Sequence, residues 1–322
     1  MPATLPPFSD LPIQRPGPPL NAWGLYGQDD ELGRLNLITP EARLKGAKAV
    51  KHGIAINLNM PLDFPKLHAE RGALEHTINH RKHANDDILT FNTQGSSQWD
   101  GFRHYPYQHY PEKGQYRYYG DQTTEEARDK SVLRNGTQNF VHHPISSRAH
   151  LLDIERYINR HNLKPLTYFA ESSGIPVEYL EDCAKESNVD IQPGDILIVR
   201  IGYIDALMNL PETERNTLVE REVRAWPGVE PSEEMMKWHW EKGIAAVVTD
   251  GVAYEKIPFP PDKLSLHQVF LAGWGLPIGE LFDLRKLGEE CARLNQYTFL
   301  FTSMPLYVNG GIASPPNAQA IL

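Results

Sequence analysis

The chain has 322 residues, of which 40% are hydrophobic and 23% charged, and its formal net charge is −9 at pH 7. A chain of this length and composition can bury a large core, so we expect a globular protein. The negative charge, without Lys and Arg clusters interleaved with aromatic residues, argues against a nucleic-acid partner and favours a small-molecule ligand.

Membrane and secretory signals are also missing from the sequence. The N-terminus lacks the basic and apolar regions of a secretory signal, and no apolar run approaches the roughly 18 residues of a membrane helix. We therefore expect a cytoplasmic protein without a membrane partner. Cys183 and Cys291 lie far apart and lack metal or redox spacing, which predicts buried free thiols.

The first elements in chain order are an arm and a helix. Residues 1–20 are rich in proline, so we expect an extended N-terminal segment, either a tail or an arm across a neighbour, followed by a single domain over 21–322. Thr39 is a candidate helix N-cap, with Pro40 at the first helical position. These residues predict a helix that begins at Pro40.

The stretch 67–90 contains four histidines, two arginines and an acidic pair without clean periodicity. We expect a long loop here, followed by a strand that leads into residues 95–108. Loops of this length are often functional.

The second half of the chain alternates between strand and helix patterns. Apolar runs rich in β-branched and aromatic residues predict strands within 195–201, 244–250 and 297–308. Helical spacing over 176–188 and 231–243, with Ser232 as an N-cap, predicts two helices. This alternation predicts a layered α/β domain whose sheet is covered on both faces.

The segment 95–108, GSSQWDGFRHYPYQ, is the first candidate site. It holds Asp100 and His104 four positions apart, and Gln94 lies just before it. Buried polar groups without partners cost roughly 1 to 3 kcal/mol each, so such a dense set is expected to converge on an ion or a polar ligand. The alternative is a solvated loop in which the Asp and His occur by chance.

A second cluster lies in residues 263–284, which place His267 in a short apolar helix and Glu280 in a strand-like run. An isolated histidine on an apolar face is more simply a hydrogen-bonded core residue. A glutamate is almost never buried without a partner. A cation bound by Asp100, His267 and Glu280 would account for all three residues.

The sequence resembles the cyclase-like hydrolases, a family that includes bacterial kynurenine formamidases and isatin hydrolase, over nearly its whole length. The segments that carry the resemblance are WGLYGQDDELGRLNLIT, GSSQWDGFRH, HLLDI, IQPGDILIVRIGY, WPGVEPSEEMMKW, IAAVVTD, residues 267–280, and FLFTSMPLYVNGGIASPPNAQAI. The resemblance implies a swivelling β/β/α domain with a mixed sheet core and flanking helices. It also implies a homo-oligomer, dimer or tetramer, with a divalent metal.

The family motif also assigns roles to residues. By resemblance, Asp100 bridges metal, His104 is the acid/base histidine, and His267 and Glu280 complete the site. Two other metal-binding histidines of the motif correspond here to Gln94 and Gln98. An amide oxygen is a harder and weaker ligand than imidazole, so the set Gln94, Gln98, Asp100, His267 and Glu280 is expected to prefer Mn²⁺ or Mg²⁺ over Zn²⁺, or to hold no metal.

These observations lead to a functional hypothesis. We expect hydrolysis of a C–N or ester bond in a small aromatic or cyclic compound, such as a formamide, lactam or lactone, by metal-activated water. The expected catalytic residues are His104, Asp100 and Glu280, and the expected substrate-binding residues are Trp99, Phe102, Arg103 and Tyr105. Two alternatives remain open. One is a metal-independent cyclase, dehydratase or isomerase that uses the same catalytic residues, and the other is a non-catalytic binding protein.

Overall fold

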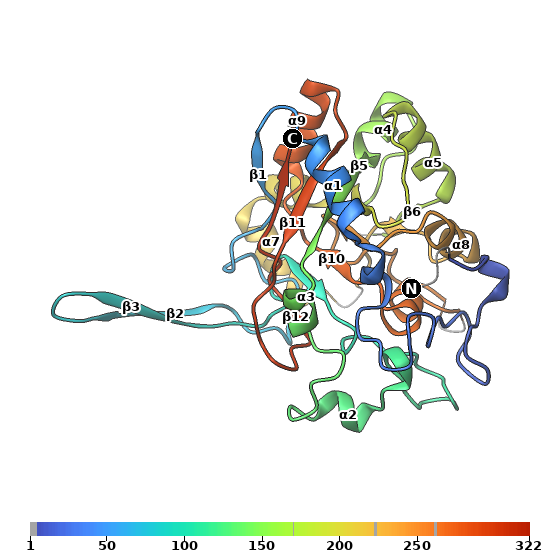
Figure 1. Ribbon diagram of the computed structural model, residues 1–322. Helices are drawn as coiled ribbons and strands as arrows, with labels where there is room; N and C mark the ends of the chain where they lie inside the picture. Colours follow the sequence, from blue (N-terminus) through green and yellow to red (C-terminus); the bar gives the residue numbers. More distant parts are fainter. Residues whose placement is uncertain (1–4, 170, 222–223, 261–262) are drawn as a thin grey trace.

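A mixed β-sheet runs through the middle of the protein, as the computed structural model shows (Figure 1). The structure describes residues 5–169, 171–221, 224–260 and 263–322. Within these ranges the sheet has nine strands in the order β1-β13-β11-β5-β7-β9-β10-β4-β12. The strands are Ala55–Asn57 (β1), Gln98–Asp100 (β4), Ile145–Asp153 (β5), Ile196–Arg200 (β7), Ala246–Thr249 (β9), Ile278–Glu280 (β10), Thr298–Ser303 (β11), Ala313–Ser314 (β12) and Ala318–Ile321 (β13). Neighbouring strands from β5 to β10 pair in parallel, and the remaining pairs are antiparallel.

Helices flank this sheet, which confirms the predicted α/β fold. The α-helices are Pro40–Ala49 (α1), Thr124–Arg128 (α2), Gln138–His142 (α3), Ile154–Arg160 (α4), Val177–Glu186 (α5), Tyr203–Asn209 (α6), Glu212–Thr217 (α7), Glu233–Glu241 (α8) and Arg285–Leu294 (α9). A π-helix spans Gln268–Trp274, and short strands Gly174–Ile175 (β6) and Gly228–Val229 (β8) pair beside the main sheet. Within the described ranges, no helix combines the length and apolar character needed to cross a membrane.

The central strands are buried on both faces. Along β7, Leu197 and Val199 pack into a core with residues of α4, α5 and α8, whereas Ile196 and Ile198 pack into a second core with residues of α9. Successive side chains of a strand point to opposite faces, so the continuous apolar run of β7 serves both cores. The prediction of a sheet covered on both sides is confirmed.

Local sequence signals fix the helix starts as expected. The Thr39 hydroxyl accepts a hydrogen bond from the Ala42 amide, and α1 begins at Pro40. The Ser232 hydroxyl accepts one from the Met235 amide at the start of α8. Each bond satisfies an amide that the first helical turn leaves free.

The segment 67–90 differs from the expected long loop. Glu75–His80 (β2) and Asn85–Thr90 (β3) form an antiparallel hairpin that projects far from the body of the protein, toward the left of Figure 1. Both strands are exposed along nearly their whole length, so polar residues occupy both faces. The hydrophobic alternation that identifies a half-buried strand is therefore missing.

The N-terminal segment is anchored by aromatic and apolar side chains of the same chain. Residues 5–20 pack on the chain's own domain, where Phe8 and Leu11 are buried in the core. The indole nitrogen of Trp240 donates to the Pro6 carbonyl at 2.7 Å, and that of Trp274 donates to the Leu20 carbonyl at 2.8 Å. Residues 1–4 of the expected arm lie outside the described residues.

A buried histidine makes stability depend on pH. His239 in α8 is fully buried, with Nδ1 2.8 Å from the Met235 carbonyl oxygen and Nε2 2.8 Å from the Tyr254 hydroxyl. A neutral imidazole satisfies both partners by donating from Nδ1 and accepting at Nε2. Burial lowers the pKa of His239 from 6.5 to about 3.

We expect this histidine to destabilise the fold in acid. Between the folded and unfolded pKa values the unfolded chain binds the extra proton, so stability present above pH 6.5 is lost as the pH falls, at about 1.4 kcal/mol per pH unit. Urea unfolding of wild type and His239→Gln at several pH values from 7.5 to 4.5 measures this slope. The variant should show a shallower dependence, and parallel curves for the two proteins would contradict the assignment.

Candidate active site

The pairing of β4 with β10 brings the first site residues together. In this antiparallel pair Glu280 lies opposite Gln98, and Ile278 lies opposite Asp100. Opposed residues share a face and alternate residues return to it, so Gln98, Asp100 and Glu280 project from the same face of the sheet. Gly279 lies opposite Trp99 on the other face. A Cβ on Gly279 would lie 2.9 Å from Phe282 and 3.1 Å from Trp99, so this position needs a glycine.

His267 reaches the same place from the turn that begins the π-helix. The Glu255 carboxylate accepts hydrogen bonds from the backbone amides of Leu266 and His267, at 2.6 and 2.9 Å. It also lies 2.7 Å from His267 Nδ1. Glu255 therefore fixes both the start of this helix and the orientation of the imidazole, and Nε2 is left to face the sheet.

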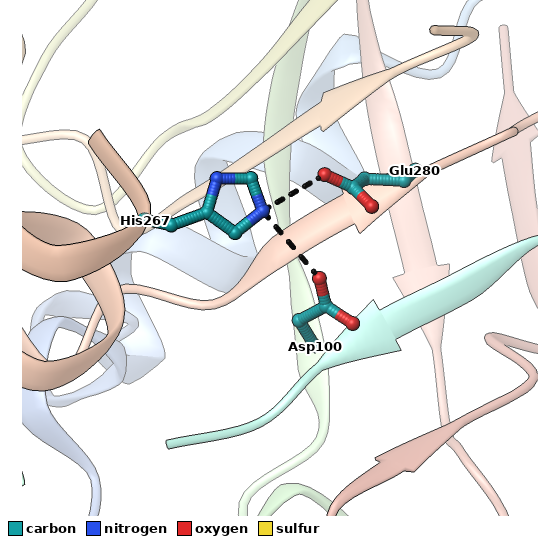
Figure 2. A group of neighbouring side chains, drawn as sticks. All are labelled: Asp100, His267 and Glu280. Atoms are coloured by element: carbon teal, nitrogen blue, oxygen red, sulfur yellow. Dashed lines mark ion pairs between the residues drawn. The ribbon is translucent and has the colours of Figure 1, made fainter. Parts of the chain in front are cut away.

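Asp100, His267 and Glu280 converge as Figure 2 shows. His267 Nε2 lies 3.2 Å from Glu280 Oε1 and 3.8 Å from Asp100 Oδ2. One ligand atom from each of the three residues lies within 4.8 Å of the other two, and all three side chains are buried. The arrangement joins an imidazole from a helix to carboxylates from two neighbouring strands, which is a geometry that can hold a metal ion.

The site concentrates charge in a buried place. Burial raises the pKa of Asp100, and the nearby Glu280 carboxylate adds to this increase, although the histidines act against it. Burial alone would lower the pKa of His267, but the hydrogen bonds to Glu255 and Glu280 outweigh it and raise this pKa well above the ordinary value. In the absence of metal the imidazolium therefore neutralises part of the acidic cluster, and metal binding must displace its Nε2 proton.

Two buried oxygens of the site have no hydrogen-bond partner among the described residues. They are Asp100 Oδ2 and Gln98 Oε1. A buried oxygen without a hydrogen bond is costly, and a cation would satisfy it. This feature of the chain fits a metal ion independently of the distances within the cluster.

The two glutamines face the carboxylates through their nitrogens. Gln94 Nε2 donates to Asp100 Oδ1 at 2.6 Å, and Gln98 Nε2 donates to Glu280 Oε2 at 3.0 Å. In this orientation they hold the carboxylates in place, whereas the sequence predicted their amide oxygens as ligands. Rotating an amide by half a turn exchanges its oxygen and nitrogen, and such assignments follow from the hydrogen-bond network.

His104 lies at the open side of the cluster. Its Nε2 is 3.8 Å from Asp100 Oδ2, and its side chain is 22% exposed, whereas that of Asp100 is fully buried. With Tyr105, it borders a cavity of about 150 Å³ that reaches His267 and Glu280. The apolar residues of the cavity wall are Trp226, Val252, Ala253, Ile257 and Phe259. The cavity thus joins a partly accessible imidazole to an apolar pocket.

Three residues expected to bind substrate lie elsewhere. Trp99 packs edge-on against Phe282 in the core, and Phe102 packs against Tyr119 and Phe140. The Arg103 guanidinium donates to the backbone carbonyls of Ala127, Val132 and Gly310, among others. Since none of the three borders the site cavity, their side chains stabilise the surrounding fold.

Two residues of the site were not found from the sequence. Glu255 follows a tyrosine in a loop whose sequence carries no motif. Arg71 lies in the segment 67–90, which was expected to be a loop. Arg71 borders the cavity and donates from Nη1 to the Gln94 carbonyl at 2.6 Å. An acidic residue 12 positions before His267 is a weak signal, because only the tertiary fold brings the two together.

Comparisons with known proteins agree with this architecture. The family profile described as "Putative cyclase" matches residues 51–256. A crystal structure titled as a novel cyclase is 26% identical, covers 94% of this chain and 99% of its own, and superposes with a TM-score of 0.80. Among curated proteins, no sequence matches.

Two isatin hydrolase structures share the fold at low identity. Isatin hydrolase A from Labrenzia aggregata, bound to benzyl benzoate, is 12% identical, with 86% of this chain and 96% of that chain covered and a TM-score of 0.56. Isatin hydrolase A from Ralstonia solanacearum is 13% identical, with 88% and 97% covered and a TM-score of 0.55.

Proposed function

Because the chain belongs to the cyclase family, whose profile covers residues 51–256, we propose that it is a metal-dependent hydrolase. The observation that carries this proposal is the buried convergence of Asp100, His267 and Glu280, in which Asp100 Oδ2 accepts no hydrogen bond from the described residues. The fold that it shares with isatin hydrolases supports the same reaction class. The bond cleaved is a C–N or ester bond in a small aromatic or cyclic compound.

Asp100, His267 and Glu280 would hold the metal, and Gln98 Oε1 is a further oxygen beside them. A set with two carboxylates and one imidazole, extended by amide oxygen, favours Mn²⁺ or Mg²⁺ over Zn²⁺. When bound, such an ion polarises a carbonyl group and increases the acidity of water. With an ion bound, Glu255 would keep the remaining His267 proton on Nδ1, so that Nε2 could present its lone pair.

His104 is the general acid and base of the proposed reaction. Its imidazole borders the cavity, with Nε2 3.2 Å from Gln94 Nε2 and 3.8 Å from Asp100 Oδ2. It takes a proton from the attacking water and returns one to the leaving nitrogen or oxygen. Tyr105, 5.5 Å from His267 between ring centroids, forms part of the wall beside it. The apolar cavity receives the ring of the substrate.

Metal analysis and activity together test the proposal. Protein purified without chelator should contain manganese or magnesium near stoichiometry, and it should hydrolyse a member of a panel of aryl formamides, lactams and lactones. EDTA should remove the activity, and added Mn²⁺ should restore it. Turnover that persists after chelation would instead support the metal-independent cyclase or isomerase. Tightly bound zinc pairs would contradict the ligand preference.

We also propose that the chain forms a homo-oligomer through the hairpin of β2 and β3. Ile78 and Leu89 project from one face of the hairpin and Ile88 from the other, and they are 56%, 44% and 59% exposed. An isolated two-stranded hairpin is marginally stable in water. A second copy of the chain would cover these residues and stabilise the hairpin.

Substitutions in the hairpin should therefore change the size of the particle. We expect the wild type to sediment as a dimer or larger at micromolar concentration, and Ile78→Lys with Ile88→Lys to shift it toward the monomer. Leu44→Lys in α1 is a matched control, because Leu44 is 60% exposed on the body of the protein. Analytical ultracentrifugation measures all three. A monomeric wild type, or an unchanged size in the double variant, would contradict the assignment.

A further inference from the structure

We propose that Arg71 forms an anion-binding subsite beside the active site, and that the substrate is an aromatic or cyclic compound with a carboxylate remote from the bond that is cleaved. This inference deepens the proposed function and rests on it. It assigns to Arg71 the orienting role that the sequence suggested for Arg103.

Arg71 stands between two cavities. It borders the site cavity of about 150 Å³, together with His104 and His267, and it also borders a neighbouring cavity of about 260 Å³. The apolar side chains that line the second cavity include Leu62, Phe64, Leu67, Leu74 and Phe91. A cation with apolar surroundings on both sides can bind the charged end of a ligand whose ring packs against those surroundings.

The Arg71 guanidinium has no acidic partner among the described residues. Its side chain donates from Nη1 to the Gln94 carbonyl, and no described carboxylate lies within the 4.0 Å of an ion pair. The adjacent acid, Glu70, is bound instead by both terminal nitrogens of Arg224, each at 3.1 Å. Since a guanidinium has five N–H donors, most of those on Arg71 remain available to a ligand.

The neighbouring His68 does not replace this charge. Burial, and then the positive charge of Arg71, lower the pKa of His68 to about 4. Its ring lies against Trp226, with 5.4 Å between centroids, and it borders both cavities as Arg71 does. His68 is therefore neutral near pH 7 and lines the cavities as an uncharged ring. The positive charge at this place is carried by Arg71.

The charges of the site explain why an anion needs Arg71. Asp100, Glu255 and Glu280 are three buried acids, so an anionic ligand that approaches them is repelled. A carboxylate bound to Arg71 through two parallel hydrogen bonds is instead held at one end of the cavity. Gln94 links the two groups, because its carbonyl accepts from Arg71 and its side-chain nitrogen donates to Asp100.

The cavity also suits a single ring. An apolar cavity of about 150 Å³ accommodates a benzene molecule. Trp226 and Phe259 supply flat apolar surfaces to such a ring. In the proposed pose the carboxylate binds Arg71 and the far side of the ring faces His104 and Glu280, which border the same cavity. The reacting carbonyl is therefore expected on that side of the substrate.

Binding of two probes of equal shape tests the subsite. Isothermal titration calorimetry should show that the wild type binds benzoate more tightly than the neutral benzamide. Arg71→Gln should lose about tenfold to a hundredfold in benzoate affinity, the range expected for charge-assisted hydrogen bonds, and should leave benzamide unchanged. Arg71→Lys should fall between the two, because lysine keeps the charge but not the planar fork. Arg128→Gln, which removes an equal charge from exposed helix α2, should bind both probes as wild type does.

Two outcomes would overturn the subsite. One is benzoate binding that is unchanged in Arg71→Gln, as expected if the carboxylate binds only a metal. The other is an equal loss of benzoate and benzamide affinity in Arg71→Lys. These results are independent of turnover. A protein that hydrolyses nothing but discriminates the probes through Arg71 would refute the proposed reaction and leave the subsite in place.

Discussion

Asp100→Asn should abolish both metal binding and hydrolysis. Asp100 is fully buried between Gln94, His104 and His267, and its Oδ2 has no hydrogen-bond partner. Asparagine keeps the size of the side chain but removes the negative charge that a cation requires. Changing a residue that only hydrogen-bonds to a metal ligand lowers metal affinity by up to about a hundredfold. Asp100 is a candidate ligand itself, so we expect its substitution to lower the affinity for Mn²⁺ by more than that.

The same substitution should stabilise the metal-free protein. A buried carboxylate oxygen without a partner costs roughly 1 to 3 kcal/mol, and a neutral amide avoids the repulsion from Glu280. Thermal unfolding with and without Mn²⁺ measures both effects. The wild type should gain melting temperature with Mn²⁺, whereas Asp100→Asn should start higher and gain nothing.

A graded control comes from Glu255→Gln. This variant removes the charge beside His267 Nδ1 but leaves Asp100, His267 and Glu280 in place. Metal affinity should fall by about tenfold to a hundredfold, less than for Asp100→Asn. If Mn²⁺ raised the melting temperature of Asp100→Asn as much as that of the wild type, the metal site would have to lie elsewhere.

The central fold could be predicted because its signals are local. The strands β7, β9 and β11 are apolar runs with β-branched residues, and the caps at Thr39 and Ser232 act within three residues of their partners. Each element is therefore encoded by neighbours in sequence. The order of the nine described strands is not encoded in this way, because β4 and β12 come together only through distant contacts.

The hairpin and the N-terminal segment show where this reasoning stops. The hairpin strands β2 and β3 carry polar residues on both faces, so nothing in the pattern separates them from a loop. Proline density describes the composition of the N-terminal segment, but the packing of this segment is decided by isolated side chains such as Phe8. A single aromatic residue among prolines gives no periodicity to detect.

The candidate residues that the structure brings together include polar residues isolated in apolar sequence. Glu280 and His267 were conspicuous for this reason, and the structure brings both to Asp100. Glu255 and Arg71 lie in polar stretches, where one more charge is unremarkable. The aromatic residues Trp99 and Phe102 were assigned to the substrate because they flank Asp100, yet alternation along β4 turns Trp99 to the opposite face.

His104→Ala should lower kcat by about a hundredfold to ten-thousandfold, the usual contribution of a positioned acid or base. Metal binding should remain, because His104 is outside the group formed by Asp100, His267 and Glu280. The Mn²⁺-induced gain in melting temperature therefore separates this variant from Asp100→Asn. His52→Ala is the matched control, since it removes an exposed imidazole outside the site and the hairpin.

Rescue by a small molecule distinguishes proton transfer from a structural role for His104. The side chain is 22% exposed at the edge of the cavity, so its truncation opens a space that solvent can reach. Added imidazole should restore part of the activity of His104→Ala and have no effect on Asp100→Asn. A structural role would give no rescue, because free imidazole cannot repair a distorted fold. Full activity in His104→Ala without imidazole would remove His104 from the mechanism and leave water or Tyr105 to move the protons.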